Sequence, residues 1–538
     1  MGISSNVLIF TLVFTINFSL LGQENKIIEI RKAGGSRKDQ QTYPGANILF
    51  KDTNNRVLLF HEGALIESDL AYFYSKDNFF KAEGNVIFTQ GDTIKMTCKK
   101  IEYNGKTKIA KANGNVFLKR PDTSLSTEEL KLNRVTNQAF YESKGVIVDS
   151  SSTLTSSRGK YYIEEKKYRF VTNVNIYNPQ YTVNSNQLDY YTELNEAYLF
   201  GDSKIEGENY TIECKSGFYD LKNEKGYFKK DATLYYDNKI IKGDSLYFEN
   251  EKNYAAGTEN VSIIDSINNS IIKGHYAEIF KARDSAVVTK NALSINIIDK
   301  DTLYIHADTL LATGPEEKRI IRGYYDVKIL KNDITGRSDS LHLDRLVGLT
   351  KLLRKPLTRK QEQIFTEAQK NKSNPVIWFD KSQMSGDKIY LISNKETNKL
   401  DSLKIIGNVL IIEKDTLSEN GFNQIKGGLL DGSFKDGNLD NIIITKNTEM
   451  IYYLYNDEDL QLIGIDKTTC SGLMMNFLEG EINDITFLVA PTGNVYPENE
   501  IPLNDRTLKG FIWRDDERPT SVYDLFDNYD KDEKLIKP

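Results

Sequence analysis

The sequence predicts an all-β fold built of repeated units of about 30 residues with two strands each. Three observations predict it: a phrase that returns at a near-constant interval, alternation of apolar and polar residues after each copy, and polar turn sequences between copies. The phrase is Gly-Asn-Val or a variant, and its third residue falls at positions 86, 116, 146, 174, 203, 232, 261 and 292. A fixed period of this size indicates stacked supersecondary units.

The bulk composition limits the possible functions. The chain has 538 residues, of which 39% are hydrophobic and 27% charged, and its formal net charge is -6. A chain of this length is too long for one ordinary core but natural for a solenoid. Binding to nucleic acid needs a basic stripe, so the mild acidity argues against that class of partner.

The first 23 residues are expected to be a signal peptide. Residues 7–21 are mostly apolar, and a short stretch ending at Gln23 precedes the charged Glu24. The run is too short and too interrupted to span a bilayer, which favours an export signal. No Lys or Arg precedes it, which departs from the usual signal pattern. A buried N-terminal strand is the alternative.

Residues 24–344 are expected to form a first block of repeats with two strand signals per unit. One signal is the Asn-Val phrase followed by alternation, as in Val86-Ile87-Phe88. The other is an acidic or hydroxyl residue that leads an alternating run, as in Asp244-Ser245-Leu246. Alternation with Tyr, Ile, Val and Thr is typical of strands with one buried face. We expect both signals to open strands, with tight turns such as Asn104-Gly105 between them.

Residues 345–375 interrupt the repeats and are expected to be a basic helical insert. Residues 358–370 have a helical composition between Pro356 and Pro375. A surface connector is the plain interpretation, and a docking element for a partner is the alternative. The repeats resume in a second block, residues 376–514, where Gly407-Asn408-Val409 is a clean copy. Residues 515–538 form an acidic tail that we expect to be flexible.

Catalytic and metal signals are weak, so neither a catalytic residue nor a cofactor is predicted. None of the nucleophile, zinc-hydrolase or phosphate-loop motifs occurs. The four histidines include His306 and His342, each two residues before an Asp; we favour a structural role over a metal site because the strand motif itself recurs. The three cysteines, Cys98, Cys214 and Cys470, are too few and too far apart for a disulfide framework.

These features together resemble the OstA/LptA family of lipopolysaccharide transport proteins. The likeness rests on the apparent signal peptide, the repeated Gly-Asn-Val and Gly-Asp phrases and the lack of a disulfide pattern, over about residues 46–344 and again from about Trp378. It is closest to the long OstA-like proteins of Bacteroidota, whose C-terminal portion resembles residues 508–513 with Arg518-Pro519. The departures are the size and the basic insert. The resemblance implies a V-shaped β-jelly roll (β-taco) with an apolar trough and no enzymatic activity.

In that fold the inward side chains are the alternating apolar set. These trough-lining, lipid-binding candidates are Val86, Phe88, Ile94, Met96, Val116, Leu118, Leu130, Leu132, Val174, Ile176, Ile212, Leu246, Phe248, Val261, Ile263, Leu303, Ile305, Leu341, Leu343, Val409 and Ile411. The same residues would also fill an ordinary closed core, and the sequence alone leaves that interpretation open.

The resemblance implies a periplasmic bridge that carries lipopolysaccharide from the inner to the outer membrane, with its acyl chains in the trough. Implied partners are other β-jelly-roll transport proteins, which link an inner-membrane ATPase complex to an outer-membrane translocon by edge-to-edge strand addition; self-association is a further option. Peripheral attachment to the outer membrane is compatible with this role. The main alternative is an exported, non-enzymatic repeat protein that binds polysaccharide or a protein partner. A polysaccharide lyase on a β-helix is less favoured, because no facing cluster of acidic and basic residues can be assembled.

Overall fold

The computed structural model describes residues 27–527, except 93, 122, 268, 299–300, 316–317, 395–396, 398, 457 and 479–480. The predicted signal peptide and the end of the predicted tail therefore lie outside the described residues. The chain divides into two compact units, residues 1–172 and 173–538. In the described part, no helix has the length and apolar character needed to cross a bilayer.

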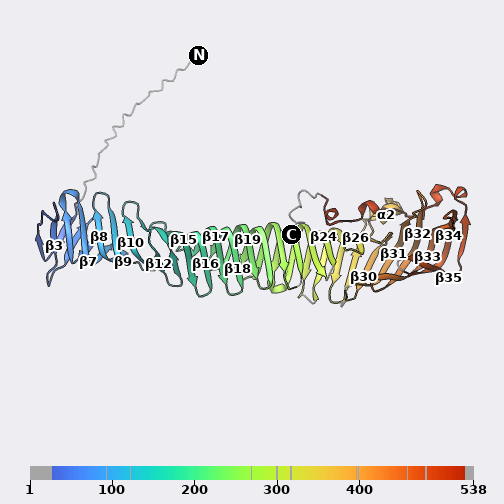
Figure 1. The fold of residues 1–538 in the computed structure, drawn as a ribbon, viewed down its shortest axis with the longest axis horizontal. Coiled ribbons are helices and arrows are strands. Elements are labelled where there is room, and N and C mark those ends of the chain that lie inside the picture. Colours follow the sequence, from blue (N-terminus) through green and yellow to red (C-terminus); the bar gives the residue numbers. More distant parts are fainter. Residues whose placement is uncertain are drawn as a thin grey trace, which may run out of the picture. The chain divides into compact units, whose positions relative to one another are not determined.

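The strands of unit 1 are antiparallel and pair mostly with their neighbours in sequence (Figure 1). They are β1 (Glu29–Lys32), β2 (Gly35–Arg37), β3 (Asn47–Phe50), β4 (Val57–His61), β5 (Ala64–Ser68), β6 (Leu70–Tyr74), β7 (Phe79–Gln90), β8 (Ile94–Asn104), β9 (Ile109–Lys119), β10 (Ser124–Asn133), β11 (Gln138–Tyr141), β12 (Gly145–Val148), β13 (Thr153–Ser156) and β14 (Arg158–Tyr162), and the boundary between the units falls within β15 (Lys167–Asn178).

Unit 2 repeats the same antiparallel pairing and adds two short helices, α1 (Arg359–Ile364) and α2 (Glu367–Lys372). Its strands are β16 (Tyr181–Tyr191), β17 (Glu196–Gly207), β18 (Tyr210–Asp220), β19 (Lys225–Tyr236), β20 (Lys239–Glu249), β21 (Tyr254–Asp265), β22 (Ser270–Phe280), β23 (Ser285–Ile298), β24 (Asp301–Thr313), β25 (Ile320–Leu330), β26 (Ile334–Asp344), β27 (Leu349–Leu353), β28 (Val376–Phe379), β29 (Ser382–Ser385), β30 (Lys388–Ser393), β31 (Leu400–Lys414), β32 (Phe422–Lys435), β33 (Asn438–Tyr455), β34 (Leu462–Leu478), β35 (Glu481–Leu488) and β36 (Thr492–Tyr496).

The Gly-Asn-Val phrase forms a corner in the middle of a strand instead of opening one. In β7, Gly84 and Asn85 both have positive φ, and the two residues face Lys99 alone on β8. Such a bulge bends the strand and strengthens its twist. Glycine suits the first position because a Cβ there would lie 2.9 Å from the Cβ of Asp69. The predicted period is therefore right, whereas the predicted strand starts are corners.

The Asp of the second sequence signal holds the corner of the neighbouring strand. The side-chain amide of Asn260 donates to the Asp244 carboxylate at 2.6 Å, and the amide of Asn85 donates to Asp69 at 2.8 Å. Asn408 repeats this bond to Asp387. The two recurring phrases are thus two halves of one corner motif.

Each corner divides a strand between two walls. In β7, residues 79–83 lie in what we call wall A and residues 86–90 in wall B; β8 runs back through wall B and then wall A. The proof that the walls fold together comes from β18, where the hydroxyls of Tyr210 and Tyr219 are 2.7 Å apart. Nine residues of straight strand would separate them by about 30 Å. The structure confirms the predicted all-β repetitive fold with a short helical insert.

The helical insert replaces a corner. β27 pairs with the wall A part of β26 and β28 with its wall B part, so the two behave as one strand that is interrupted by residues 354–375. Both helices begin with a capping box, at Thr358 and Thr366. β27 lies within the residues expected to be a linker, so the sheet continues through that region.

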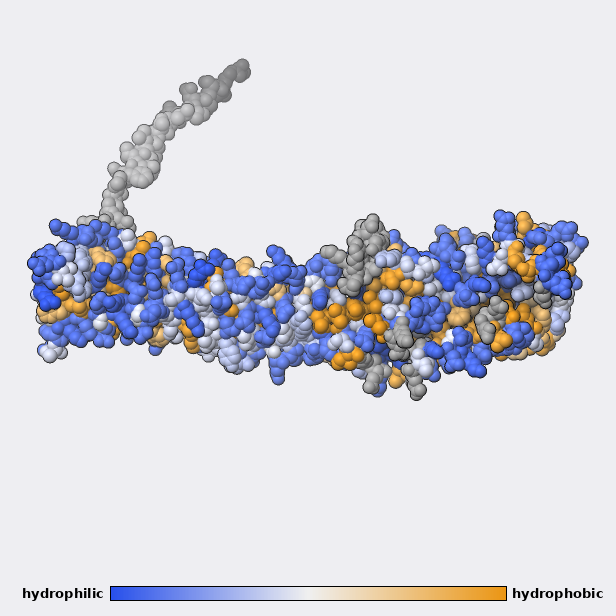
Figure 2. Space-filling view, viewed as in Figure 1, coloured by the Kyte–Doolittle hydropathy of each residue, from blue (hydrophilic) through white to orange (hydrophobic). Residues whose placement is uncertain are grey.

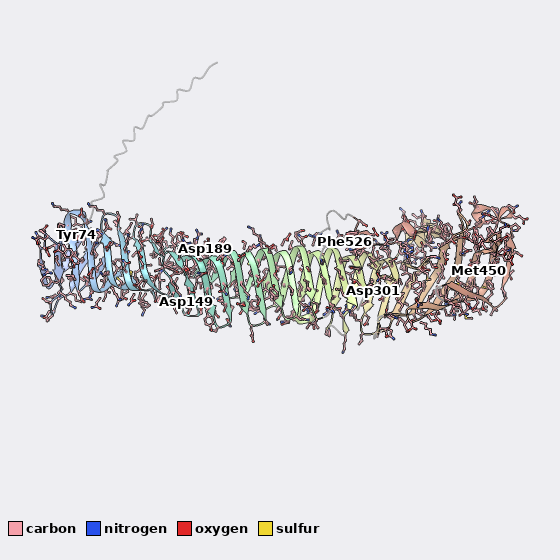
Figure 3. The ribbon with its side chains drawn as sticks, in the orientation of Figure 1. Tyr74, Asp149, Asp189, Asp301, Met450 and Phe526 are labelled. Atoms are coloured by element: carbon pink, nitrogen blue, oxygen red, sulfur yellow. The ribbon has the colours of Figure 1, made fainter. Side chains whose placement is uncertain are left out.

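Residues 497–527, here called the C-terminal segment, lie on the outer face of wall B in unit 2. The Gln424 side chain bonds the main chain at both Arg506 and Leu508, and the Gln383 side chain does the same at Ile512 and Arg514. Leu525 and Phe526 pack on Leu293. Figure 3 labels Phe526. We expected a flexible tail from Asp515, and its first part, to Asp527, is packed in this way.

Candidate functional site

The interior between the walls is the candidate functional site, because it holds the side chains predicted to line a trough. All of them lie on the inward face of their strands. All are buried except Ile94, Leu303 and Leu343, which are half-buried. Unit 1 and unit 2 therefore each contain the inward apolar rows that the alternation predicted.

Side chains from opposite walls touch across this interior. In unit 2 the ring of Phe248, from wall A of β20, lies 4.7 Å from that of Tyr210 and 5.6 Å from that of Tyr236, both from wall B. Phe248 is 0% exposed. The protein's own side chains fill the interior here, as in the closed-core interpretation.

The free ends of the two walls face each other along what we call the mouth. In unit 1 Arg134, from a wall A turn, donates to Gln90 at 3.0 Å and to the carbonyl oxygen of Glu62 at 2.8 Å, both on wall B. Lys108 forms an ion pair with Glu62 at 2.6 Å, and this hydrogen-bonded ammonium holds the pKa of the Glu62 carboxyl below its usual value. The mouth of unit 1 is closed by charged side chains.

The same arginine reaches a buried pair beneath that mouth. Arg134 donates to the hydroxyl of Tyr103 at 2.8 Å, and that hydroxyl lies 2.8 Å from Nδ1 of His61. Burial raises the pKa of Tyr103, so the phenol stays protonated at neutral pH. His61 is on wall B and Tyr103 on wall A, which ties the walls together below the charged layer.

The mouth of unit 2 is closed by a succession of polar contacts between wall B and wall A. Tyr210 donates to Glu224 at 3.1 Å and Tyr236 donates to Asn253 at 3.0 Å. Further along, Lys281 pairs with Asp237, Arg319 with Asp265, and Arg345 with Asn296. Burial raises the pKa of Tyr210, which keeps its hydroxyl a donor. Apolar side chains lie inside this polar rim.

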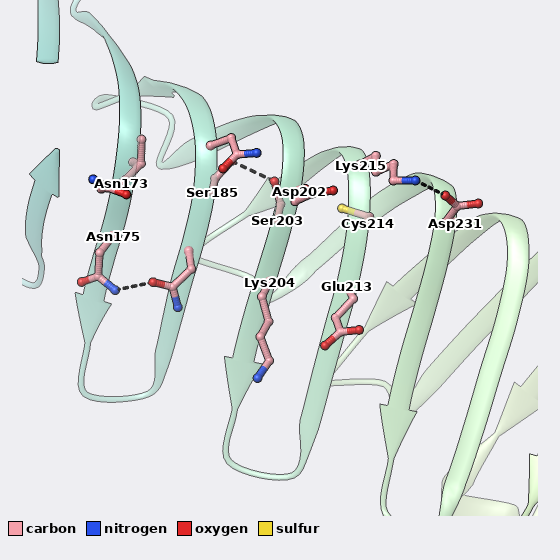
Figure 4. A pocket seen from close by; sticks show the side chains of 13 residues that line it. Asn173, Asn175, Ser185, Asp202, Ser203, Lys204, Glu213, Cys214, Lys215 and Asp231 are labelled. Carbon is pink, nitrogen blue, oxygen red and sulfur yellow. Dashed lines mark hydrogen bonds and ion pairs between the residues drawn. The ribbon is translucent and has the colours of Figure 1, made fainter. Parts of the chain in front are cut away.

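A hollow of about 640 Å³ lies at the corners of β15–β19, within residues 173–231 (Figure 4). Most of its lining side chains are polar: the hydroxyls of Ser185 and Ser203 are 2.8 Å apart, and Lys215 pairs with Asp231. It is open to solvent, and Val174 and Cys214 are the apolar residues of its lining.

The cysteines and histidines singled out in the sequence are in structural positions. Cys98 and Cys214 are free and buried, and burial raises their thiol pKa values to about 12 and about 11. The ring of His306 packs 4.6 Å from that of Phe526 under the C-terminal segment. Burial lowers the pKa of His342, so this side chain stays neutral at pH 7.

Sequence reasoning missed the residues of the mouth. None of Asp237, Asn253, Arg134 and Lys281 was singled out as a functional residue. One signal was present: cations lie in or beside several of the wall A turns, as Lys108, Lys281 and Arg345 do. Their partners lie on other turns, at distances in sequence that the repeat alone does not specify.

Comparison with known proteins places a family match in the first part of the chain. Residues 25–186 match the family model described as OstA-like protein. A search of curated proteins finds no match. Among solved structures, the chain is similar to LptH from Pseudomonas aeruginosa, whose title describes it as the LptA-homologous periplasmic component of the conserved lipopolysaccharide transport device. The identity is 12%, the match covers 20% of this chain and 75% of that one, and the TM-score is 0.18.

That structural likeness is too low to add weight to the family match. The repeats beyond residue 186 continue the same corner motif, as Asn260 and Asn408 show, although the family model does not extend to them. Residues 25–186 are therefore an OstA-like domain, which confirms the resemblance to the OstA/LptA-like family.

Proposed function

We propose that the protein is a non-enzymatic bridge for lipopolysaccharide, with the acyl chains held between walls A and B. The OstA-like match over residues 25–186 is the observation that carries this proposal. The inward apolar rows in each unit support it, because an acyl chain needs a continuous apolar path. We further propose that the chain acts in the periplasm after removal of residues 1–23.

Transfer free energies explain why such a path is needed. Each methylene exposed to water costs about 0.8 kcal/mol, so an acyl chain of ~12 carbons costs about 10 kcal/mol. A lipid with several chains cannot cross an aqueous compartment at that cost. A row of apolar side chains on every strand replaces the bilayer at each step, while the sugars stay in water. The energy for movement must come from a partner, for which we propose an inner-membrane ATPase complex.

Carriage requires the walls to move apart, because side chains such as Phe248 and Tyr210 now touch. Replacing contacts between apolar side chains by contacts with an alkyl chain exchanges one apolar environment for another. The main cost is therefore the opening of the polar mouth.

The partner is proposed to add strands at a sheet edge. Among the residues that the structure describes, β35 and β36 pair only with β34, so each presents a free edge. Unpaired edge strands are templates for another chain. A second β-jelly roll, or a second copy of this chain, fits such an edge.

Photocrosslinking in living cells tests the proposal. A photoreactive residue at Phe88, Phe248 or Ile305, all inward, is expected to capture lipopolysaccharide. The matched controls are Ile87 and Tyr247, which are the outward neighbours of Phe88 and Phe248. Capture from the outward positions alone would contradict carriage in the interior. Depletion of the protein should also lower the amount of lipopolysaccharide at the cell surface.

Binding of a polysaccharide or protein on the outside is the second candidate, and outward aromatic and apolar rows favour it. On wall A, Tyr198, Phe218, Tyr227 and Tyr247 are paired in register on β17–β20. The rings of Tyr198 and Phe218 are 5.2 Å apart, those of Tyr227 and Tyr247 are 4.8 Å apart, and Tyr227 is 55% exposed.

Wall B carries an outward aliphatic row of its own. Ile240, Ile264, Ile271 and Ile295 are paired in register on β20–β23, and Figure 2 shows an apolar patch in this region. Ile264→Lys tests a role in partner binding, and Tyr227→Ser tests sugar binding. The second candidate predicts loss of the respective ligand in each variant with no change in lipopolysaccharide at the surface.

A further inference from the structure

One group of contacts at the mouth of unit 2 joins three turns through a single lysine. Lys281 Nζ lies 2.8 Å from the Asp237 carboxylate and 4.1 Å from the centre of the Tyr236 ring. The hydroxyl of Tyr236 donates to Asn253 at 3.0 Å. Asp237 and Tyr236 belong to wall B, whereas Lys281 and Asn253 belong to wall A turns. We call these four residues the latch.

The latch is the more easily broken closure when it is compared with its neighbour on the same mouth. The side chains of Lys281 and Asp237 are 29% and 49% exposed, whereas those of Arg319 and Asp265 are 12% and 6% exposed. An exposed ion pair stabilises little, but a buried pair leaves an uncompensated charge when it is broken. Although the Arg319–Asp265 contact is longer, at 3.8 Å against 2.8 Å, its burial makes separation of that pair more costly than separation of Lys281 from Asp237.

Opening at the latch leaves the backbone hydrogen bonds intact. The contacts within the latch that cross the mouth are between side chains. The backbone bonds of these turns run along one wall, for example from the amide of Lys281 to the carbonyl of Asn253. The walls can separate here by rotating side chains, while the ladders within each wall stay formed.

Apolar and small side chains lie directly below the latch. The ring of Tyr236 contacts that of Phe248 edge-on at 5.6 Å. The inward positions of wall A on β21 and β22 include Ala255 and Ala277, both buried. Ile279 faces inward beside Ala255 and is also buried, so the side chains of Phe248 and Ile279 must move to admit a chain here, whereas the two alanines need not.

We infer that the latch is a lateral entry site through which an amphiphile inserts its alkyl chain into the interior of unit 2. This entry site rests on the proposed function and specifies where the carried lipid enters the protein. The chain passes between Tyr236 and Lys281, and the polar head stays at the rim, where Asp237, Asn253 and Lys281 offer both charge signs and an amide. The ligand class is an amphiphile with at least one long alkyl chain.

A charge-exchange cycle on the full chain tests the latch. The variants are Lys281→Glu, Asp237→Lys and the double exchange, in a background with Cys98, Cys214 and Cys470 replaced by Ala and with Ala255→Cys as a reporter. Labelling of Cys at 255 by a small maleimide measures opening without any lipid. Capture of a 12-carbon fatty acid with a photoreactive chain end, followed by mass spectrometry, measures entry.

Each single charge change is expected to raise the labelling rate and the capture rate by about fivefold, and the double exchange to restore both. Lys215→Glu and Asp231→Lys make the same charge changes at a corner pair and should alter neither rate. Tyr236→Phe, which removes only the bond to Asn253, serves if a charge variant does not fold.

The two outcomes that contradict the inference are distinct. Unchanged labelling in the single variants and in Tyr236→Phe would overturn the latch as a gate. Faster labelling without capture of the fatty acid in any variant would leave an opening mouth but would overturn both the entry site and the proposed carriage of lipid.

Discussion

Strands β19–β20 and strands β31–β33 contain the same corner motif, but they differ in burial. The first pair buries only its inner face, whereas wall B of the second group buries both its inner and its outer face. In β20 buried residues alternate, with Leu246 and Phe248 inward and Tyr247 between them partly exposed. In β31 the four residues 409–412 are all buried. The difference arises because the C-terminal segment covers the outer face of wall B at β31–β33. Alternation of apolar and polar residues in a strand indicates that one face is covered, whereas a continuous series of apolar residues indicates that both faces are covered.

The C-terminal segment covers that face outside the β-ladders, and it includes short 3-10 helices at Glu498–Glu500 and Leu503–Asp505. Ile501 and Leu508 pack on Ile451, Tyr453 and Ile465, which all point outward. Two buried glutamines supply the polar contacts that a neighbouring strand would otherwise make. Four measurable effects distinguish the inner face, which is buried in both regions, from the outer face, which is buried only in β31–β33.

The largest effect is expected from the shared inner face. Phe248→Ala should lower the free energy of unfolding by about 3–5 kcal/mol, because it leaves a cavity between the walls. Denaturant unfolding followed by far-UV circular dichroism measures it. Tyr247→Ala, one residue away on the outer face, is the control and should lower stability by about 1 kcal/mol or less. Equal losses would contradict the assignment of inward and outward faces.

The next effect comes from the outer face of β33. Ile451→Ala should destabilise unit 2 by about 2–4 kcal/mol, since the C-terminal segment loses its packing partner. Thr211→Ala, at an outward wall B position of β18, should change stability by about 0.5 kcal/mol or less. Thermal unfolding of the two variants checks this. A small effect of Ile451→Ala would show that the segment does not stay on this face in solution.

A smaller effect is expected from the glutamine that fixes the register of the segment. Gln424→Ala removes the bonds to Arg506 and Leu508, which should cost about 1–3 kcal/mol. Limited proteolysis should then cut residues 497–527 faster, while cleavage in the turns of β16–β21 stays the same. Gln424→Glu keeps the acceptor and should show an intermediate rate. Unchanged cleavage in the alanine variant would contradict the role of this side chain.

The smallest effect is a dependence on pH at the end of the segment. The hydrogen bond from Lys328 to Asp527, at 2.8 Å, holds the pKa of that carboxyl below its usual 3.8. The stabilisation is therefore present above about pH 4 and is lost as the pH falls through the lowered pKa. Hydrogen exchange at Leu525 and Phe526 should rise over that interval, and less so in Asp527→Asn. An equal rise in that variant would assign the effect to other carboxyls.

The repeat, the alternation and the inward residues could be predicted from the sequence because each depends on neighbours within one unit. The corners were misplaced, since a bulge with left-handed Asn and Gly has the same local composition as a turn that opens a strand. The latch could not be predicted, because Lys281 meets Asp237 only after two strands fold at their corners. The burial of residues 409–412 on both faces was signalled by their continuous apolar run, but the segment that covers them has no strand-like alternation of apolar residues.

The break between β27 and β28 shows that the architecture accepts new material at its corners. The chain leaves the sheet after Leu353, forms α1 and α2, and re-enters in register at Val376, with both parts paired to β26. An insertion at a corner lengthens the unit without shifting either wall, whereas an insertion within a wall would displace every inward side chain beyond it. Corners are thus where such a chain can gain an epitope, a reporter domain or, over evolution, a new module.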